Sequence, residues 1–265
     1  MTKVRLSHGL RQLLADDPCS FLLYAIEQVQ EQAHHRRLGR VLRRLQRRKY
    51  ELGWVHVSDL EEPCERVIAA RLLGYTLPQA KPTPQLQRIL ENGTYMHLRY
   101  YNYFLSLPPP FEVQVARIFR HWPIIGEADV VVFHPEFNWQ IIELKSMNER
   151  QFKSLRTPQS SHVNQLNGYL GLFDKAAPLP QKVVGQVWYE CKNTQNVKTY
   201  PLPYNPTSYL QARQRLCSVS EGVLAGRLPP ACGGCELDEY VGSLEGVEEK
   251  IEQLSIVKEQ QWLPR

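Results

Sequence analysis

In three consecutive segments near the middle of the chain, apolar residues form runs interrupted by a few polar ones, a pattern that predicts β-strands. The segments read "FEVQVARIF" from residue 111, "IIGEADVVVF" from residue 124 and "NWQIIELKS" from residue 138. They are rich in β-branched and aromatic residues and are separated by short turn-like stretches. Two further segments of the same kind span residues 182–190 and 197–204. These five segments predict the strands of one sheet.

A helical period of 3.6 dominates the regions before and after these strands. We expect helices over 8–50, 58–73, 84–105, 161–173, 206–225 and 242–265. Ser58 followed by Glu61 has the spacing of a capping box at the start of the second helix. The last helix carries an apolar stripe of Leu244, Val247, Ile251 and Leu254, so it docks within the chain or pairs with another helix.

This order of elements predicts an α/β fold, with a mixed β-sheet flanked by helices. We expect three regions: a basic helical N-terminal region at 1–57, a core at 58–228, and a cysteine-containing segment with an acidic helix at 229–265. A chain of 265 residues is long enough for one large core with additions.

The amino-acid composition limits the kinds of protein that this chain can be. Hydrophobic residues make up 43% of the chain, which is ordinary for a globular protein. No apolar stretch approaches the roughly 20 residues of a membrane span, and the first residues show no signal-peptide core. We therefore expect a cytoplasmic protein, in a bacterial, archaeal or phage-infected cell, with no membrane partner and with its six cysteines reduced or bound to metal.

Charge is unevenly distributed along the chain. Basic residues outnumber acidic ones in 1–50, and the reverse holds in 230–265. Within residues 34–49, an apolar stripe is surrounded by cations, among them Arg36, Arg40, Arg43, Arg44, Arg47 and Arg48. Such a face is either simply solvated or contacts a polyanion. Mutual repulsion among so many cations makes a phosphate backbone a reasonable partner.

The segment "QIIELKS" places Glu143 and Lys145 on one face of an otherwise apolar strand. One interpretation is an ion pair within the strand. The other is half of a metal-dependent site, because Asp129 lies on the preceding predicted strand, across a short turn. Two neighbouring carboxylates repel each other unless a cation lies between them, and their oxygens suit Mg²⁺ or Mn²⁺.

Four short motifs in order carry a resemblance to a known family. "GEAD" and "IIELK" resemble the catalytic core of the PD-(D/E)XK nuclease superfamily. "NGTYMH", with Gly93 and His97, is similar to a motif of its RecB-like nuclease domains, and "HVNQLNGY", with Gln165 and Tyr169, is similar to another. The resemblance covers roughly residues 60–200 and extends to phage and CRISPR-associated members. It implies a restriction-endonuclease-like core.

The resemblance also implies roles for individual residues. Asp129, Glu143, His97 and the backbone carbonyl of Leu144 would bind Mg²⁺ or Mn²⁺. Lys145 would orient the attacking water, and Gln165 and Tyr169 would hold Lys145 or the substrate phosphate. His162 and Lys153 are further candidates for contact with DNA.

The cysteines suggest a second centre. Cys232 and Cys235 form "CGGC", and Cys64 lies far upstream. This layout resembles RecB-like nucleases that carry a 4Fe–4S cluster, but Val241 stands near the place of their last cysteine. Cys217 is the candidate substitute. The interpretations are therefore an iron–sulfur cluster, a zinc ion with another ligand, or no metal.

The function expected from this resemblance is a divalent-metal-dependent DNA nuclease. An exonuclease acting on single strands or duplex ends is favoured, in DNA processing, recombination or CRISPR adaptation. The alternative is a nucleic-acid-binding subunit that does not cleave, or that cleaves only with a partner. The apolar stripe of the C-terminal helix keeps self-association or a protein partner open.

Overall fold

The computed structural model describes residues 22–26, 51–75, 83–176, 183–230, 232–233 and 246–262. The Arg-rich segment lies outside these residues, so its predicted contact with DNA stays a prediction. No helix within the described ranges is both long enough and apolar enough to cross a bilayer.

A six-stranded mixed sheet forms the centre of the described structure, in the order β1-β3-β4-β5-β6 with β2 on the other edge of β3. The β2–β3, β3–β4 and β5–β6 pairs are antiparallel, whereas β1–β3 and β4–β5 are parallel. The strands are β1 Val55–His56, β2 Glu112–His121, β3 Ile124–His134, β4 Asn138–Met147, β5 Val183–Cys191 and β6 Val197–Leu202. The expected α/β class, with a mixed sheet flanked by helices, is confirmed.

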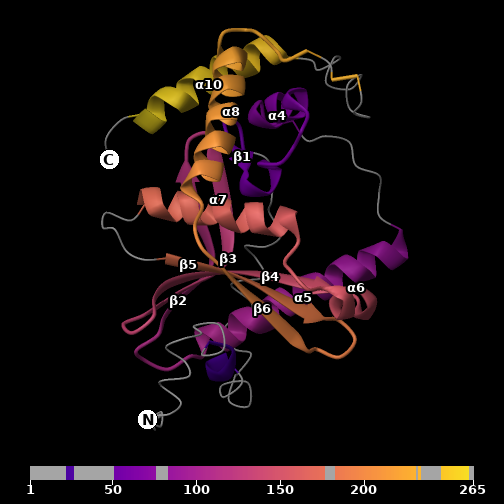
Figure 1. Cartoon of the computed structure of the whole chain (residues 1–265). Coiled ribbons are helices and arrows are strands. Elements are labelled where there is room, and N and C mark those ends of the chain that lie inside the picture. The colour runs from indigo at the N-terminus through magenta and orange to yellow at the C-terminus, as the bar shows by residue number, and fades with distance from the viewer. Residues whose placement is uncertain are drawn as a thin grey trace.

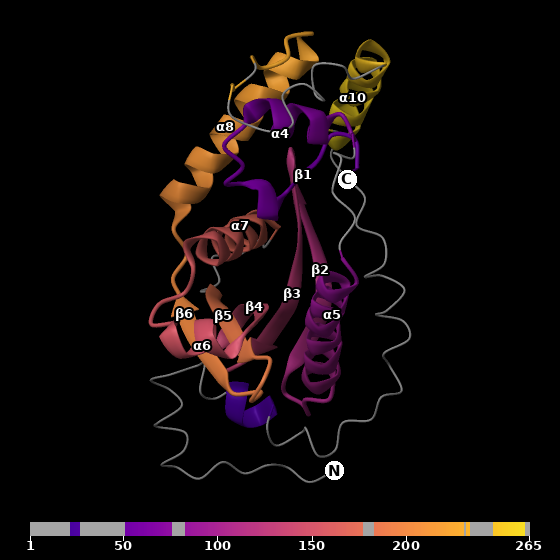
Figure 2. The same cartoon turned by 90° about the vertical axis from the view of Figure 1, so that its right-hand side faces the viewer.

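Helices cover both faces of the sheet (Figures 1 and 2). The long helix α5 packs on one face and α7 crosses the other. Helices α4, α8 and α10 gather at the end of the sheet that carries β1. The helices are α4 Glu65–Leu72, α5 Pro84–Leu105, α6 Glu149–Ser154, α7 Ser160–Ala176, α8 Pro206–Leu224 and α10 Val247–Trp262, with a 3-10 turn, η2, at Val57–Asp59.

The regular alternation of β3 breaks at Asp129. Residues two apart in a strand normally point to the same side of the sheet. Ala128, however, packs in the core on the α7 side, whereas Val130 packs in the core on the α5 side. Opposite Asp129 on β2 lies Ala116, whose φ of 50° is left-handed, and neither residue appears in the otherwise continuous register of the two strands. Such a conformation costs energy for any residue except glycine. Asp129 itself points to the α5 side, so the break falls between Asp129 and Val130.

The break coincides with a gap between neighbouring strands. On one edge of β3, β1 pairs with Ile124 and Ile125, and β4 pairs only with Val130–His134. Residues 126–129 thus have no ladder partner on that edge among the described strands. Asp129 lies at the end of this gap, facing β4.

Two glycines let α7 approach its neighbours closely. A Cβ at Gly126 would lie 2.8 Å from the Tyr169 ring, and a Cβ at Gly171 would lie 2.3 Å from the ring of Tyr209. Real Cβ atoms do not come so close, so only glycine permits this packing. Through Gly126, α7 lies directly against β3, which brings its polar residues over the sheet.

Several expectations from the sequence need correction. The predicted helix at 58–73 begins only at Glu65, and its first residues form the η2 turn. Pro63 explains the delay, because the residue before a proline avoids the helical region. Sequence patterns did not indicate β1 or α6, which are 2 and 6 residues long.

The C-terminal helix docks within the chain. Leu254 is fully buried in the main core, and Val247 and Ile251 pack partly against it. Partners or self-association through this helix stay predictions, as do the three region boundaries.

We expect Gly171→Ala to lower the free energy of unfolding by about 1–3 kcal/mol, because the added methyl overpacks against Tyr209. Gly93→Ala is the matched control in another helix. Its Cβ would meet only the Ser146 Oγ at 3.6 Å, so this change should raise stability by up to about 1 kcal/mol. Urea unfolding with an unchanged m-value measures both. Equal stability of Gly171→Ala and the parent protein would contradict the packing described.

Candidate active site

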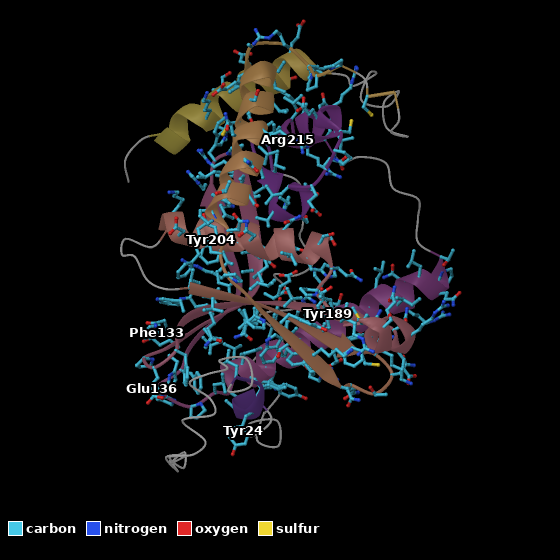
Figure 3. The ribbon with its side chains drawn as sticks, in the orientation of Figure 1. Tyr24, Phe133, Glu136, Tyr189, Tyr204 and Arg215 are labelled. Carbon is cyan, nitrogen blue, oxygen red and sulfur yellow. The ribbon has the colours of Figure 1, made fainter. Side chains whose placement is uncertain are left out.

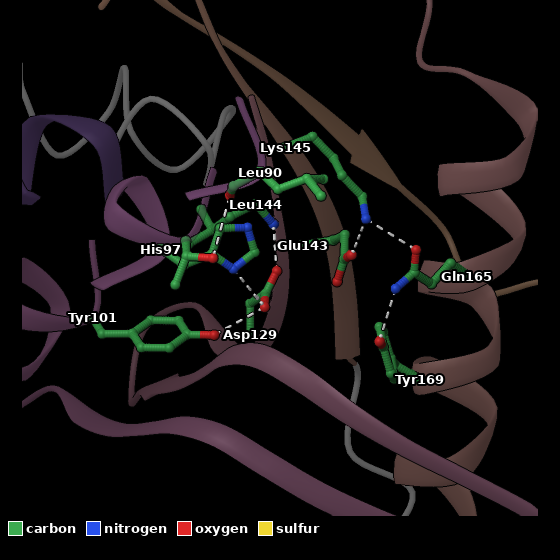
Figure 4. Close-up of polar contacts among 10 residues, drawn as sticks. Leu90, His97, Tyr101, Asp129, Glu143, Leu144, Lys145, Gln165 and Tyr169 are labelled. Carbon is green, nitrogen blue, oxygen red and sulfur yellow. Dashed lines mark hydrogen bonds and ion pairs between the residues drawn. The ribbon is translucent and has the colours of Figure 1, made fainter. Parts of the chain in front are cut away.

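Asp129 is held by three donors in the gap between β3 and β4 (Figure 4). The Nδ1 atom of His97 lies 3.1 Å from Oδ1, and the Tyr101 hydroxyl donates to the same oxygen at 2.9 Å. The backbone N–H of Leu144 donates to Oδ2 at 2.9 Å. His97 and Tyr101 lie four apart on one face of α5, so a single helix supplies two of the three contacts.

Glu143 and Lys145 begin a second chain of contacts that runs to α7 (Figure 4). Lys145 Nζ lies 2.6 Å from Glu143 Oε1 and donates to Gln165 Oε1 at 3.0 Å. The Gln165 side-chain amide in turn donates to the Tyr169 hydroxyl at 2.9 Å. Tyr169 is 3% exposed and packs in the main core. A chain of hydrogen bonds that ends at the core residue Tyr169 therefore holds the Lys145 ammonium in place.

The two carboxylates are buried and have opposite pKa shifts. Asp129 is 3% exposed and Glu143 is 2% exposed. Burial disfavours the charge of Asp129, but His97 outweighs it, with help from Lys145 and the Leu144 amide, so the pKa of Asp129 is lowered. Burial and the Asp129 charge raise the pKa of Glu143 to about 7. Paired carboxylates with separated pKa values are typical of functional sites.

The same two carboxylates shift the pKa of His97. Burial alone lowers its pKa, but its contact with Asp129 and the charge of Glu143 reverse the direction, and the pKa is raised. Burial and Asp129 also raise the pKa of Tyr101, which stays a neutral hydrogen-bond donor. Asp129 thus faces an imidazole whose protonated form it favours and a neutral phenol.

One atom of the site tests whether a divalent cation fits. Glu143 Oε2 is buried and has no hydrogen-bond partner among the described residues. An unpaired buried carboxylate oxygen is costly, and a hard cation between Glu143 and Asp129 would satisfy it. The described residues contain no cluster of three or more His, Cys, Asp or Glu side chains arranged for metal binding. Mg²⁺ often binds through one or two carboxylates plus waters, so this donor set fits it.

The structure thus brings together all six residues predicted as catalytic. Tyr101 also contacts Asp129, and the sequence analysis missed it, although its spacing of four from His97 was a usable signal. Lys153 is exposed on α6 and pairs with Glu149 at 2.6 Å. His162 lies on α7 near Lys145.

The cysteine prediction is not decided by the described residues. Cys64 is buried, Cys217 is partly buried and Cys232 is exposed. Cys235 lies outside the described residues, so a cluster that includes it stays a prediction.

We expect the metal-free protein to lose stability between about pH 5 and pH 8. Glu143 has a folded pKa of about 7, above its ordinary 4.5, so its contribution is complete below pH 4.5 and is lost as the pH rises through 7. The raised pKa of His97 acts in the same direction. The expected loss is on the order of 2–3 kcal/mol. Urea unfolding in EDTA measures it, and Glu143→Gln should remove most of it. A flat profile would contradict the assignment.

Comparisons with known proteins add the following. The sequence matches no protein-family model and no curated protein. Among solved structures, the alkaline exonuclease LHK-Exo from Laribacter hongkongensis is similar at 13% identity and a TM-score of 0.44, over 79% of this chain and 95% of that one. The same enzyme in complex with dAMP matches at 14% identity and 0.46 over the same shares. A protein named SSO0001 matches at 17% and 0.42, over 76% of this chain and 86% of that one.

Proposed function

We propose that this protein is a divalent-metal-dependent DNA nuclease that hydrolyses phosphodiester bonds, most readily as an exonuclease. The observation that carries the proposal is the pair of buried carboxylates, Asp129 and Glu143, with a lysine fixed beside them. Glu143 Oε2 has no hydrogen-bond partner among the described residues. The likeness to solved structures is too low to bear on function, so the proposal rests on the site and on the order of its motifs.

Asp129 and Glu143 are the proposed ligands of Mg²⁺ or Mn²⁺. The Leu144 carbonyl is a third, because the amide and carbonyl of one strand residue point to the same side and this amide faces Asp129. His97 positions Asp129 through Nδ1, and a direct contact of its other nitrogen with metal remains part of the proposal. When bound, the metal would neutralise charge on the phosphate undergoing attack.

Lys145 is the proposed residue that holds the attacking water. Two of its three N–H donors point to Glu143 and Gln165, which leaves one for a water or phosphate oxygen. Gln165, itself held by Tyr169, fixes this direction. Positioning and charge neutralisation are the main requirements of phosphoryl transfer, and this site offers both.

The choice of DNA and of exonuclease activity is supported by the motif order and by the cationic segment around Arg36–Arg48. A groove lined by cations suits the backbone of a single strand.

The iron–sulfur or zinc centre at Cys64, Cys217, Cys232 and Cys235 is a separate proposal. Iron and zinc analysis of anaerobically purified protein tests it.

We expect Mg²⁺ to stabilise the protein more strongly at pH 8 than at pH 6, because at pH 6 it must displace a proton from Glu143. At a concentration of about 100 Kd the gain should be about 2–3 kcal/mol. Thermal unfolding measures it in the parent protein, Asp129→Asn and Glu143→Gln, and the gain should vanish in both variants. Glu136→Gln, at an exposed turn away from the site in Figure 3, is the matched control.

End-labelled single-stranded and duplex DNA should be degraded only with Mg²⁺ or Mn²⁺. Asp129→Ala and Lys145→Ala should each lower the rate by about 10²–10⁴-fold, the range expected for a positioned group that moves protons. Lys175→Ala, an exposed lysine at the far end of α7, should leave the rate unchanged. Binding without cleavage would favour the alternative of a non-catalytic subunit. Cleavage at the parent rate in EDTA or in Lys145→Ala would refute the proposed site.

A further inference from the structure

His162 has a fixed proton arrangement that the contacts of Tyr189 determine. The Tyr189 hydroxyl accepts a hydrogen bond from the backbone N–H of Gln159 at 3.0 Å and lies 2.8 Å from His162 Nδ1. The buried phenol proton needs an acceptor, and Nδ1 is the only acceptor that the described residues place at hydrogen-bond distance from the hydroxyl. The hydroxyl therefore donates to Nδ1, and the imidazole carries its proton on Nε2.

The surroundings of His162 keep this imidazole neutral. Burial, followed by the charge of Lys145, lowers its pKa to about 4. The residue lies in the first turn of α7, where the positive end of the helix dipole also disfavours a second proton. At neutral pH, His162 is an uncharged donor.

The position of His162 relates it to the catalytic residues. One side of α7 carries His162, Gln165 and Tyr169 where the helix crosses the sheet. His162 contacts Tyr189, Gln165 contacts Lys145, and Tyr169 contacts Gln165. Tyr189 is the registered neighbour of Lys145 on the adjacent strand. Figure 3 shows Tyr189 beneath the N-terminal end of α7.

The Nε2 atom of His162 is available to a ligand. It has no hydrogen-bond partner among the described residues, and it is not one of their buried unsatisfied atoms. The side chain is half-buried, so one side contacts the sheet while the other is open.

We propose that His162 donates from Nε2 to a backbone phosphate of the bound DNA strand, next to the phosphate that is hydrolysed. The inference rests on the proposed function. Neighbouring strands lie about 4.8 Å apart, so His162, above β5, is displaced by about one strand from Lys145 on β4. It therefore contacts the substrate beside the reacting centre rather than at it, and it contributes to binding more than to the chemical step.

Two substitutions of His162 distinguish the role of Nδ1 from the role of Nε2. Asparagine retains an acceptor near Nδ1 for Tyr189 but has no group at Nε2, whereas glutamine places an amide N–H near Nε2. We expect His162→Asn to weaken binding of a short single-stranded DNA, with Ca²⁺ in place of Mg²⁺, by about tenfold or more, as for a lost hydrogen bond to a charged group. His162→Gln should recover most of the affinity. In Mg²⁺, KM should rise in His162→Asn while kcat changes little.

The salt dependence of binding distinguishes a neutral donor from a cation. Loss of a cationic contact reduces the slope of log K against log salt by about 0.7 for a single strand. We expect no such reduction in His162→Asn. In the parent protein, long-range ¹H–¹⁵N spectra should show the Nε2–H tautomer, with the Nε2 signal shifting when the oligonucleotide is added.

The outcomes separate this inference from the proposed function. If the parent protein cleaves DNA with Mg²⁺ and Lys145→Ala does not, but His162→Asn binds normally, this inference alone is wrong. A reduced salt slope or an Nδ1–H tautomer overturns it equally. A parent protein that neither binds nor cleaves DNA overturns both. Equal melting temperatures of the two His162 variants exclude a folding defect as the cause.

Discussion

Two carboxylates buried side by side are the constraint on which the rest of the site depends. Asp129 and Glu143 repel each other in surroundings that exclude water, so each needs compensation. Asp129 receives it from His97, Tyr101 and the Leu144 amide. Among the described residues, Glu143 receives a direct contact only from Lys145, on one oxygen. This inequality explains why the pKa of Asp129 falls while that of Glu143 rises.

The scaffold keeps these charges together at some cost to its own regularity. The left-handed φ of Ala116 and the break in alternation at Asp129 lie opposite each other on β2 and β3. Asp129 still alternates with Ala128 and points toward His97 and Tyr101 on α5, so the break lies after Asp129 and changes the direction of the residues that follow. Backbone irregularities of this kind persist where surrounding packing enforces them. Here the long strand pairing on both sides of Ala116 supplies that enforcement.

The sequence predicted the strands well, because runs of β-branched residues between turn-like stretches are a short-range signal, and they located β2 to β6. His97, Gln165 and Tyr169 came instead from the resemblance of their motifs to a known family, and the structure places them in the contacts around Asp129 and Lys145. Sequence patterns failed where a proline or the pairing of residues far apart in the chain determines the structure. Pro63 displaced a helix start that a capping box had indicated. β1 has two residues and exists only through pairing with β3.

Tyr101 illustrates the limit more sharply. It lies in a run of tyrosines, of which Tyr100 contacts Trp188 in the core and Tyr101 contacts Asp129. The spacing of four from His97 favours Tyr101 over Tyr100, but only the packing of α5 against β3 and β4 determines that this face of the helix meets a carboxylate. The polar role of an aromatic residue therefore depends on the partner strand.

The protonation of the site gives the metal-free protein a substitute for a bound cation. The pKa values of Glu143 and His97 are both raised, so the surroundings favour the protonated form of each group, which reduces the net negative charge around Asp129. A divalent ion that binds as proposed takes over this compensation and releases the proton of Glu143. Lys145 differs from both, because Gln165 and Tyr169 anchor it to the core independently of the ion. The residue proposed to hold the water is thus positioned by contacts that do not involve the proposed ion.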